Sequence, residues 1–347
     1  MRCSSGCPRP PVTDGEPPVA NPPGPGAGWA RRRGPADPEA LISAARDGDP
    51  RALARLVSLV EDSAAELRQV MQVIAPLAGG AHVIGLTGSP GVGKSTVTAA
   101  LVRGYRRAGQ RVGVLAVDPT SPFSGGALLG DRVRMQDHAT DDGVFIRSMA
   151  SRGHLGGLAW ATPQALRILD AAGFDVILIE TVGVGQAEVE IAATADTTLV
   201  VVAPGLGDSI QAAKAGILEI ADAFAVNKSD RPGAQEVVRD LRTMLAMARY
   251  GPDSWKPPIV STSAASGEGI ADLAAAIEAH QDWLEKSGER AARRQARARD
   301  EITAIAVAEL QRRLGGLPGE ARLEDLAARV AAGDLDPYSA ADALITD

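Results

Sequence analysis

The sequence predicts an α/β fold built on a doubly wound, mostly parallel sheet, and three observations lead to this prediction. Short apolar runs alternate with helical segments through the centre of the chain, which is the order of a βαβ fold. The apolar runs are nearly continuous, as expected for strands that are covered on both faces. A glycine-rich loop joins the first of these runs to a helical segment, at the kind of place where such sheets bind ligands.

The first 80 residues precede the alternating region and divide into two parts. Residues 1–37 are rich in Pro and Gly, lack the apolar core of a secretory signal, and are interpreted as a disordered tail. The arginines at 31–33 leave a mitochondrial transit peptide as an alternative, although acidic residues in the tail weigh against it. Residues 38–80 show helical periodicity and are predicted to form an N-terminal helical segment.

The alternating region covers residues 81–285 and is predicted to form one domain. We expect strands at residues 82–87, 112–118, 144–149, 176–181, 197–203, 223–227 and 259–262. Helical segments separate most of these strands, at residues 94–108, 163–172, 209–215, 234–248 and 270–285. Ligands bind beyond the carboxyl ends of the strands in such sheets, so residues at those ends are the candidates for a functional site.

Residues 286–347 change in composition and are predicted to form a C-terminal helical extension used for dimerisation. Charged residues dominate positions 286–300, and the basic residues among them are interpreted as a solvated face. Apolar side chains follow at helical spacing and would cover the protein's own core or a second subunit: Ile302, Ile305, Val307, Leu310 and Leu314. A helix folded back on its own domain is the alternative.

Composition limits the classes of protein to which the chain can belong. The net charge of −7 argues against a nucleic-acid-binding protein, and no apolar stretch is long enough for a membrane helix. The two cysteines, Cys3 and Cys7, cannot crosslink the fold, which suits a reducing compartment and predicts a cytoplasmic location. A metal site on this pair is an alternative, but no histidine lies nearby in the sequence.

Residues 88–96 fit the phosphate-binding pattern G-x-x-x-x-G-K-[S/T]. Glycines let the backbone bend and bring N–H groups to phosphate oxygens, and the following helix N-terminus adds positive charge. We expect Lys94 to reach the β- and γ-phosphates and the Ser95 hydroxyl to bind Mg²⁺. The predicted nucleotide-contacting residues of this loop are Gly88, Ser89, Pro90, Gly91, Val92, Gly93, Lys94, Ser95 and Thr96. A glycine-rich turn without a ligand is the alternative.

A second pattern, N-K-x-D, ends a predicted strand and favours guanine over adenine. The Asp230 carboxylate can accept hydrogen bonds from N1–H and the exocyclic amine of guanine, whereas adenine presents no matching pair of donors. Asn227 can contact the purine edge, and the Lys228 stem can cover the ring face. Ser263 and Ala264 follow the last strand, where backbone N–H groups could meet the base oxygen. The sequence therefore predicts GTP and GDP as ligands.

Four residues are candidates for Mg²⁺ binding and hydrolysis. Asp118 and Glu180 end predicted strands, and Asp131 lies in the loop that follows Asp118. Glu180 begins the pattern E-x-x-G, where many GTPases have D-x-x-G, and the Gly183 N–H could sense the γ-phosphate. Asp118 could instead cap a turn before Pro119, and Asp131 could be a surface N-cap.

Other polar residues in these loops have two interpretations. Gln186 could orient the attacking water or be a surface residue at the start of a helix. His138 and His154 are interpreted as forming local hydrogen bonds rather than taking part in catalysis. Because no arginine finger or clear water-orienting residue is found, we expect slow intrinsic hydrolysis.

Together these motifs resemble the methylmalonyl-CoA mutase-associated GTPases of the MeaB/ArgK type. The resemblance covers residues 38–347 and depends on residues 88–96, 116–122, 125–135, 148–157, 180–186 and 227–230 in series. It implies a homodimeric P-loop GTPase that escorts an adenosylcobalamin-dependent acyl-CoA mutase. In that role it would gate cofactor loading and protect the mutase from inactivation.

The resemblance also implies roles for individual residues. Lys94 and Ser95 would bind phosphate and Mg²⁺. Asp118, Asp131 and Glu180 would surround the metal and the switches. Asn227 and Asp230 would bind guanine. Lys214 falls where such proteins have a third switch that responds to the mutase, although it could equally be a solvated helix residue.

Four other classes of protein are considered. A P-loop kinase would use the same phosphate loop, but the guanine motif argues against it. A nickel or cobalt metallochaperone GTPase would bring a His-rich tract or paired C-x-x-C ligands, and this chain has four scattered histidines. The D-x-H-x-x-G signature of a cobalamin-binding protein is absent. A scaffold that binds GTP without hydrolysing it remains the fourth alternative.

Overall fold

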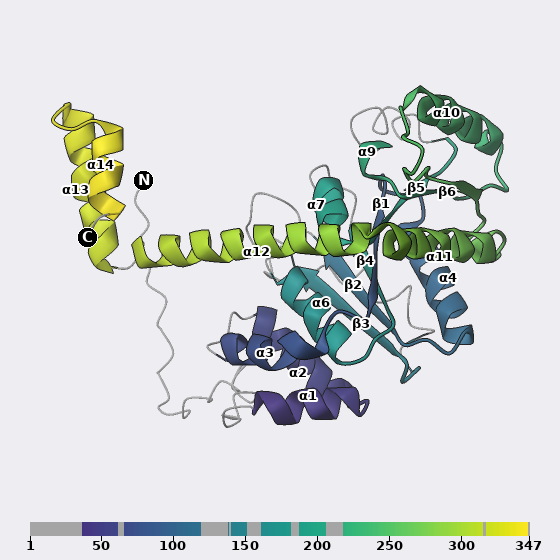
Figure 1. Cartoon of the computed structure of the whole chain (residues 1–347), viewed down its shortest axis with the longest axis horizontal. Coiled ribbons are helices and arrows are strands. Elements are labelled where there is room, and N and C mark those ends of the chain that lie inside the picture. The colour runs from purple at the N-terminus through teal and green to yellow at the C-terminus, as the bar shows by residue number, and fades with distance from the viewer. Residues whose placement is uncertain are drawn as a thin grey trace, which may run out of the picture. The chain divides into compact units, whose positions relative to one another are not determined.

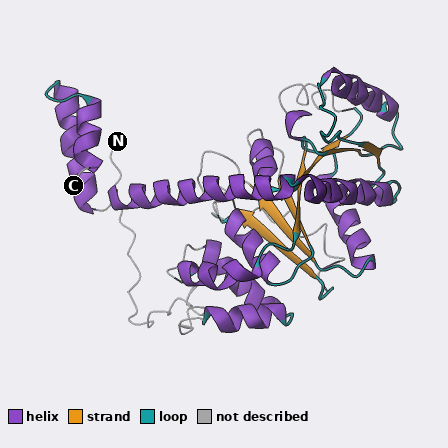
Figure 2. Ribbon diagram, in the orientation of Figure 1, coloured by secondary structure: helices purple, strands orange, loops and turns teal. Residues whose placement is uncertain are grey.

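The structure, a computed structural model, describes residues 37–61, 66–118, 138, 140–150, 161–181, 187–205, 218–314 and 317–345. Within these ranges, strands form one all-parallel sheet and helices cover both of its faces (Figure 2). The predicted α/β fold is confirmed, with a sheet that is parallel throughout. The predicted tail up to residue 36 and the predicted helix at 209–215 lie outside the described residues.

The sheet has seven strands in the order β3-β2-β4-β1-β5-β6-β7. Their bounds are β1 His82–Thr87, β2 Val112–Asp118, β3 Val144–Ala150, β4 Val176–Thr181, β5 Thr197–Val202, β6 Ala223–Val226 and β7 Ile259–Ser261. Each predicted strand agrees with the observed one to within about one residue at either end. The agreement is close because buried parallel strands are continuous apolar runs bounded by turns.

The helices occupy three stretches of the described chain. The N-terminal stretch contains α1 Pro38–Arg46, α2 Pro50–Glu61, α3 Leu67–Ile74 and the 3₁₀ turn η1 Ala75–Leu77. The region of the sheet contains α4 Lys94–Arg107, α6 Thr162–Ala171, α7 Ala187–Thr194, α9 Leu218–Ile220, α10 Ala234–Met247 and α11 Ile270–Ser287. The C-terminal stretch contains α12 Glu289–Leu314, α13 Leu317–Ala332 and α14 Pro337–Ile345. Helices are thus present in the sequence both before the first strand and after the last strand, as predicted.

Alternate residues of the strands build a core on each face of the sheet. Figure 1 labels the helices and strands that contribute to these cores. On one face, Ile84 and Leu178 belong to the cluster that includes α4 and α11. On the other face, Val83 and Ile177 belong to the cluster that includes α6 and the N-terminal helices. Burial on both sides fixes the sheet, so the loops at the carboxyl ends of the strands have a rigid support.

The first turns of α12 are bound to the amino edge of the sheet by arginines. Arg293 donates to the Asp222 carboxylate at 3.1 Å, while Arg294 donates to the Asp196 carboxylate at 2.9 Å. Arg297 also donates to Asp196. The interpretation of this basic run as a solvated face was therefore wrong for these three residues.

Asp196 shows why these contacts form. The residue is 1% exposed, and burial alone would raise the pKa of its carboxyl group. The hydrogen bonds and charges of Arg294 and Arg297 outweigh burial and hold the pKa of Asp196 well below its usual value. A buried carboxylate with two guanidinium partners therefore fixes the start of α12 to the protein.

A buried polar chain lies next to these ion pairs. His82 Nε2 lies 2.8 Å from Thr197 Oγ1, which in turn lies 2.8 Å from His280 Nδ1. His280 Nε2 lies 3.2 Å from Asp222 Oδ1. Burial lowers the pKa of His82 to about 4, so this histidine is neutral near pH 7.

Among the described helices, none has both the length and the apolar character that a membrane crossing requires.

Candidate nucleotide-binding site

The predicted phosphate-binding loop joins the carboxyl end of β1 to the N-terminus of α4. Gly88, Gly91 and Gly93 have φ angles of 139°, 79° and 98°, which side chains rarely allow. A Cβ atom at Gly88 would lie 2.1 Å from the Val201 carbonyl oxygen, and one at Gly93 would lie 2.5 Å from Asn227 Nδ2. Glycine is therefore required at both positions by conformation and by space.

The Lys94 side chain reaches from α4 back across this loop. Its Nζ atom donates to the carbonyl oxygen of Gly88 at 2.7 Å and to that of Ser89 at 3.2 Å. The residue is 7% exposed, and a buried charge is costly unless hydrogen bonds or opposite charge surround it. The loop carbonyls therefore hold a positive charge at the place where phosphates are predicted to bind.

Ser95 and Glu180 meet at the carboxyl ends of β1 and β4. The Ser95 hydroxyl donates to Glu180 Oε1 at 2.5 Å, and Glu180 is 4% exposed. These two groups offer only oxygen atoms, one of them from a carboxylate, which is the ligand type that Mg²⁺ prefers. The residues present therefore fit a magnesium ion beside the phosphate loop.

The other predicted acidic and switch residues are less fully described. Asp118 is the last residue of β2, two residues after Ala116, which pairs with Glu180 of β4. This places its backbone at the same edge of the sheet as the Ser95–Glu180 pair. Asp131 and Gly183 lie outside the described residues, as do the three further candidates Gln186, His154 and Lys214. His138 is buried, and within the described part of the chain its Nε2 atom has no hydrogen-bond partner.

Asn227 links the phosphate loop to the loop after β7. Its Nδ2 atom donates to the Val92 carbonyl oxygen at 2.9 Å. Its Oδ1 atom accepts a hydrogen bond from the Ala264 N–H at 3.1 Å and one from Thr262 Oγ1 at 3.4 Å. The amide therefore positions two loops, in addition to the purine contact that the sequence predicts for it.

The rest of the guanine motif adjoins the same two loops. Lys228 has a φ angle of 58°, rare for a residue with a side chain, and its Nζ donates to the Gly91 carbonyl oxygen at 2.6 Å. Asp230 is exposed, and its Oδ1 atom accepts a hydrogen bond from Ser263 Oγ at 3.0 Å. The structure thus brings together the three groups of residues predicted to contact nucleotide: the phosphate loop, the N-K-x-D residues, and the loop with Ser263 and Ala264.

Two residues of this site were not predicted from the sequence. Thr98 donates from Oγ1 to Glu180 Oε2 at 3.0 Å, and Thr262 contacts Asn227. Both are buried threonines in apolar surroundings, where sequence alone indicates packing. The spacing of Thr98, three residues after Ser95 on one helix face, was the available signal.

The remaining loop residues have more ordinary surroundings. Val92 is buried in the core between the sheet and α4, whereas Pro90 is exposed and Thr96 is half-buried.

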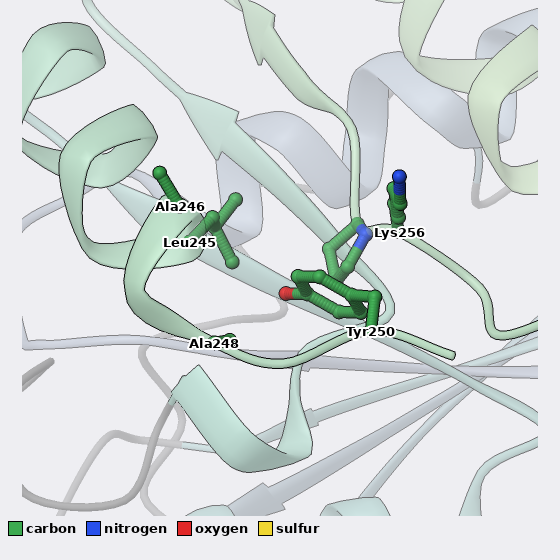
Figure 3. A pocket seen from close by; sticks show the side chains of 6 residues that line it. Leu245, Ala246, Ala248, Tyr250 and Lys256 are labelled. Atoms are coloured by element: carbon green, nitrogen blue, oxygen red, sulfur yellow. The ribbon is translucent and has the colours of Figure 1, made fainter. Parts of the chain in front are cut away.

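A separate surface pocket lies at the C-terminal end of α10 and contains none of the predicted site residues (Figure 3). Its lining residues are Leu245, Ala246, Ala248, Tyr250, Lys256 and Pro257.

The sheet is parallel, and its first strand leads through a glycine loop and a lysine into a helix. This arrangement defines a P-loop nucleotide-binding protein. Comparison with known proteins identifies the family. The sequence model of the family described as methylmalonyl Co-A mutase-associated GTPase MeaB matches residues 53–317. The chain belongs to this family. It is a GTPase and binds guanine nucleotide.

Relatives and a solved structure agree with this assignment. A Pyrococcus horikoshii protein whose name assigns it to the GTPases is 49% identical over 307 residues, which are 88% of this chain and 96% of the relative. The GTPase ArgK of Escherichia coli is 37% identical over 70% of this chain and 76% of its own. A crystal structure titled LAO/AO transport system kinase has a TM-score of 0.66 and 27% identity, covering 88% of this chain and 96% of that one.

A mammalian protein is also similar to this chain. The mouse protein named methylmalonic aciduria type A homolog, mitochondrial, is 35% identical over 268 residues, which are 72% of this chain and 64% of that protein.

Proposed function

We propose that this GTPase depends on Mg²⁺ and escorts an adenosylcobalamin-dependent acyl-CoA mutase of the methylmalonyl-CoA mutase type. In this role it gates cofactor loading and protects the mutase from inactivation. The family description and the name of the mouse relative support the partner. The observation that carries the nucleotide part is the Asn227 amide, which holds the phosphate loop against the guanine loop.

The described residues suggest how the site binds its ligands. The Lys94 ammonium would attract the β- and γ-phosphates, and Asp230, oriented by Ser263, would accept the hydrogen bonds of guanine. Ser95 and Glu180 would hold Mg²⁺, which when bound neutralises charge on the phosphates. Asp118 and Asp131 are proposed to complete the acidic set, and the Gly183 N–H to respond to the γ-phosphate.

Nucleotide selectivity tests this part of the proposal. Calorimetry with the full chain and MgCl₂ is expected to give heat of binding with GTP and with GDP. An excess of ATP is expected not to displace labelled GDP. Efficient competition by ATP would favour the alternative of a P-loop kinase, and binding that is indifferent to Mg²⁺ would remove the magnesium site.

The escort role requires that the GTP and GDP forms differ in affinity for the mutase, since hydrolysis otherwise does no regulatory work. We expect slow intrinsic hydrolysis and a faster rate when the cognate mutase orders the site. Phosphate release is measured with and without saturating mutase, and binding is confirmed separately by co-sedimentation. An unchanged rate in the complex would refute the stimulation, and phosphate release absent in both conditions would favour a scaffold.

We also propose that the protein is a homodimer formed through its C-terminal extension. On α12, Ile302 is 68% exposed, Ile305 42%, Val307 47% and Leu310 54%. A row of exposed apolar side chains on one helix is costly in water and favours burial against a second subunit. Light scattering is expected to give twice the mass of the chain, and Ile302→Asp with Leu310→Asp is expected to give the single-chain mass. A single-chain mass for the unmodified protein would exclude the dimer.

A cytoplasmic location is the remaining part of the proposal. It is supported by the two cysteines, Cys3 and Cys7, which cannot crosslink the fold. Neither nucleic acid nor a membrane is proposed as a partner, because the net charge is −7 and no described helix suits a membrane span. Fractionation of cells that produce the native protein tests the location.

A further inference from the structure

Thr98 holds the oxygen of the Glu180 carboxylate that Ser95 does not bind. Its Oγ1 atom lies 3.0 Å from Glu180 Oε2, and the Ser95 hydroxyl binds Oε1. Thr98 is 0% exposed, so water cannot replace this contact. The two hydroxyls lie three residues apart on one face of α4 and together take both oxygens of one carboxylate.

This arrangement matters because the acidic residue is a glutamate. A glutamate side chain has one more rotatable bond than an aspartate, and its carboxylate can therefore turn more freely. Two hydroxyl partners, one for each oxygen, fix the plane of the group. With Thr98 removed, Oε2 would lose this buried hydroxyl partner on α4, and the orientation of the carboxylate would be less tightly defined.

The hydroxyl of Thr98 is used differently from those of other helical threonines. Thr194, Thr243 and Thr303 each donate to the carbonyl oxygen four residues earlier, at 2.8, 2.9 and 2.9 Å. Thr98 has the same contact with the Lys94 carbonyl oxygen at 3.0 Å and in addition reaches the carboxylate. A hydroxyl has one proton to donate, and a charged acceptor forms the stronger hydrogen bond.

We propose that Thr98 is a positioning residue of the GTPase site, which keeps Glu180 oriented so that Oε1 and the Ser95 hydroxyl together present a magnesium site. Thr98 itself contacts neither nucleotide nor metal in this role. The inference rests on the magnesium site proposed above and adds a residue that no motif of the sequence singles out.

The test compares Mg²⁺ affinity in four forms of the full chain. GDP with a fluorescent label is bound, and MgCl₂ is titrated while the rate of GDP release is followed. Thr98→Val keeps the shape of the side chain and removes the hydroxyl. It is expected to raise the Mg²⁺ concentration at half-effect about tenfold, the value of one hydrogen bond to a charged group. GDP affinity without Mg²⁺ is expected to stay unchanged.

Two variants control for other effects. Thr98→Ser keeps the hydroxyl and is expected to restore Mg²⁺ affinity to within about twofold of the unmodified protein. Thr162→Val removes another hydroxyl that is 0% exposed and whose Oγ1 has no hydrogen-bond partner among the described residues, so it is expected to leave Mg²⁺ affinity unchanged. Near-ultraviolet circular dichroism checks that each variant is folded.

A shorter acid gives an independent test if Thr98→Val folds poorly. Glu180→Asp is expected to weaken Mg²⁺ binding, because the shortened side chain cannot reach both hydroxyls. In that background Thr98→Ser is expected to have no further effect, and Thr98→Val is expected to have far less effect than in the unmodified protein.

The outcomes separate this inference from the magnesium proposal. Equal Mg²⁺ affinity in the unmodified protein and in Thr98→Val would overturn the role of Thr98. A loss of GDP affinity that is equal with and without Mg²⁺ would also overturn it, because it would show a general structural effect. If GDP release from the unmodified protein does not respond to Mg²⁺, the magnesium site itself is refuted.

Discussion

The two edges of the central sheet use polar residues in opposite ways. At the amino edge, Asp196 is 1% exposed and both of its oxygens are bound by arginines of α12. At the carboxyl edge, Asp230 is exposed and binds the Ser263 hydroxyl, which leaves room for a ligand. The comparison indicates that the amino edge stabilises the fold with ion pairs to a buried carboxylate, whereas the carboxyl edge leaves one carboxylate, Asp230, accessible to a ligand.

The largest effect is expected at the amino edge. Asp196→Ala leaves Arg294 and Arg297 without their buried partner and is expected to lower the free energy of unfolding by about 3 kcal/mol. Nucleotide affinity is expected to stay unchanged, because this edge is remote from the phosphate loop. Urea unfolding at pH 7 measures the first quantity, and titration with labelled GDP measures the second.

Arg299→Ala is the matched control for Asp196→Ala. Arg299 lies on the same helix, but its side chain is 77% exposed and pairs with an exposed acid. Removing it is expected to change the free energy of unfolding by less than about 0.5 kcal/mol. If both variants lose the same stability, the amino edge does not anchor α12 in the way described.

The next largest effect is expected at Asp230, the carboxylate proposed to bind guanine. Asp230→Asn is expected to weaken GTP binding about a hundredfold, because an amide cannot accept both hydrogen bonds of guanine. The same change is expected to improve binding of xanthosine triphosphate, whose exocyclic oxygen needs a donor. Stability is expected to stay unchanged, since Asp230 is exposed. Equal GTP affinity of the two proteins would remove Asp230 from the site.

The amino edge is also expected to respond to pH. The pKa of His82 falls to about 4 on folding, so between pH 6.5 and 4 the unfolded chain binds the proton more readily than the folded one. This contribution to stability is therefore complete above pH 6.5 and is lost as pH falls. At pH 5 the expected loss is about 2 kcal/mol relative to pH 7.5.

His82→Gln isolates this contribution. Its side chain does not titrate, so the variant is expected to show a smaller difference between urea unfolding at pH 7.5 and at pH 5. Asp196 does not contribute to the difference in stability between pH 7.5 and pH 5, because its lowered pKa keeps it ionised throughout this pH range. An identical pH dependence in the two proteins would show that other groups cause the loss.

The smallest effect is expected from the residue that orients Asp230. Ser263→Ala removes the hydroxyl that donates to Asp230 Oδ1 and is expected to weaken GTP binding about fivefold. The change is smaller than that at Asp230 because the guanine contacts remain possible. Thr303→Ala, which removes an exposed hydroxyl on α12, serves as the control with no expected change. A larger loss in Ser263→Ala than in Asp230→Asn would mean that the backbone of the loop has moved.

The sequence predicted the fold well because the relevant signals are local. Strands buried on both faces appear as apolar runs, and a glycine loop with a lysine marks where the first strand meets a helix. The seven strands and the loops at Lys94 and Asn227 therefore stood out without any long-range information.

The contacts that were missed join distant parts of the chain. Arg294 and Asp196 lie 98 residues apart, and no local pattern shows that a basic run will meet a buried carboxylate. Thr98 and Glu180 lie 82 residues apart, and a threonine in an apolar helix indicates only packing. Such pairs depend on which helix covers which strand, which sequence periodicity does not specify.

The Asn227 amide has a consequence for nucleotide exchange. One side chain contacts both the loop proposed to bind the phosphates and the loop proposed to bind the base. A nucleotide bound as proposed would therefore be held at its two ends by loops that one amide joins. We therefore expect that a protein which displaces the loop after β7 also loosens the phosphate loop, and so speeds departure of the whole nucleotide.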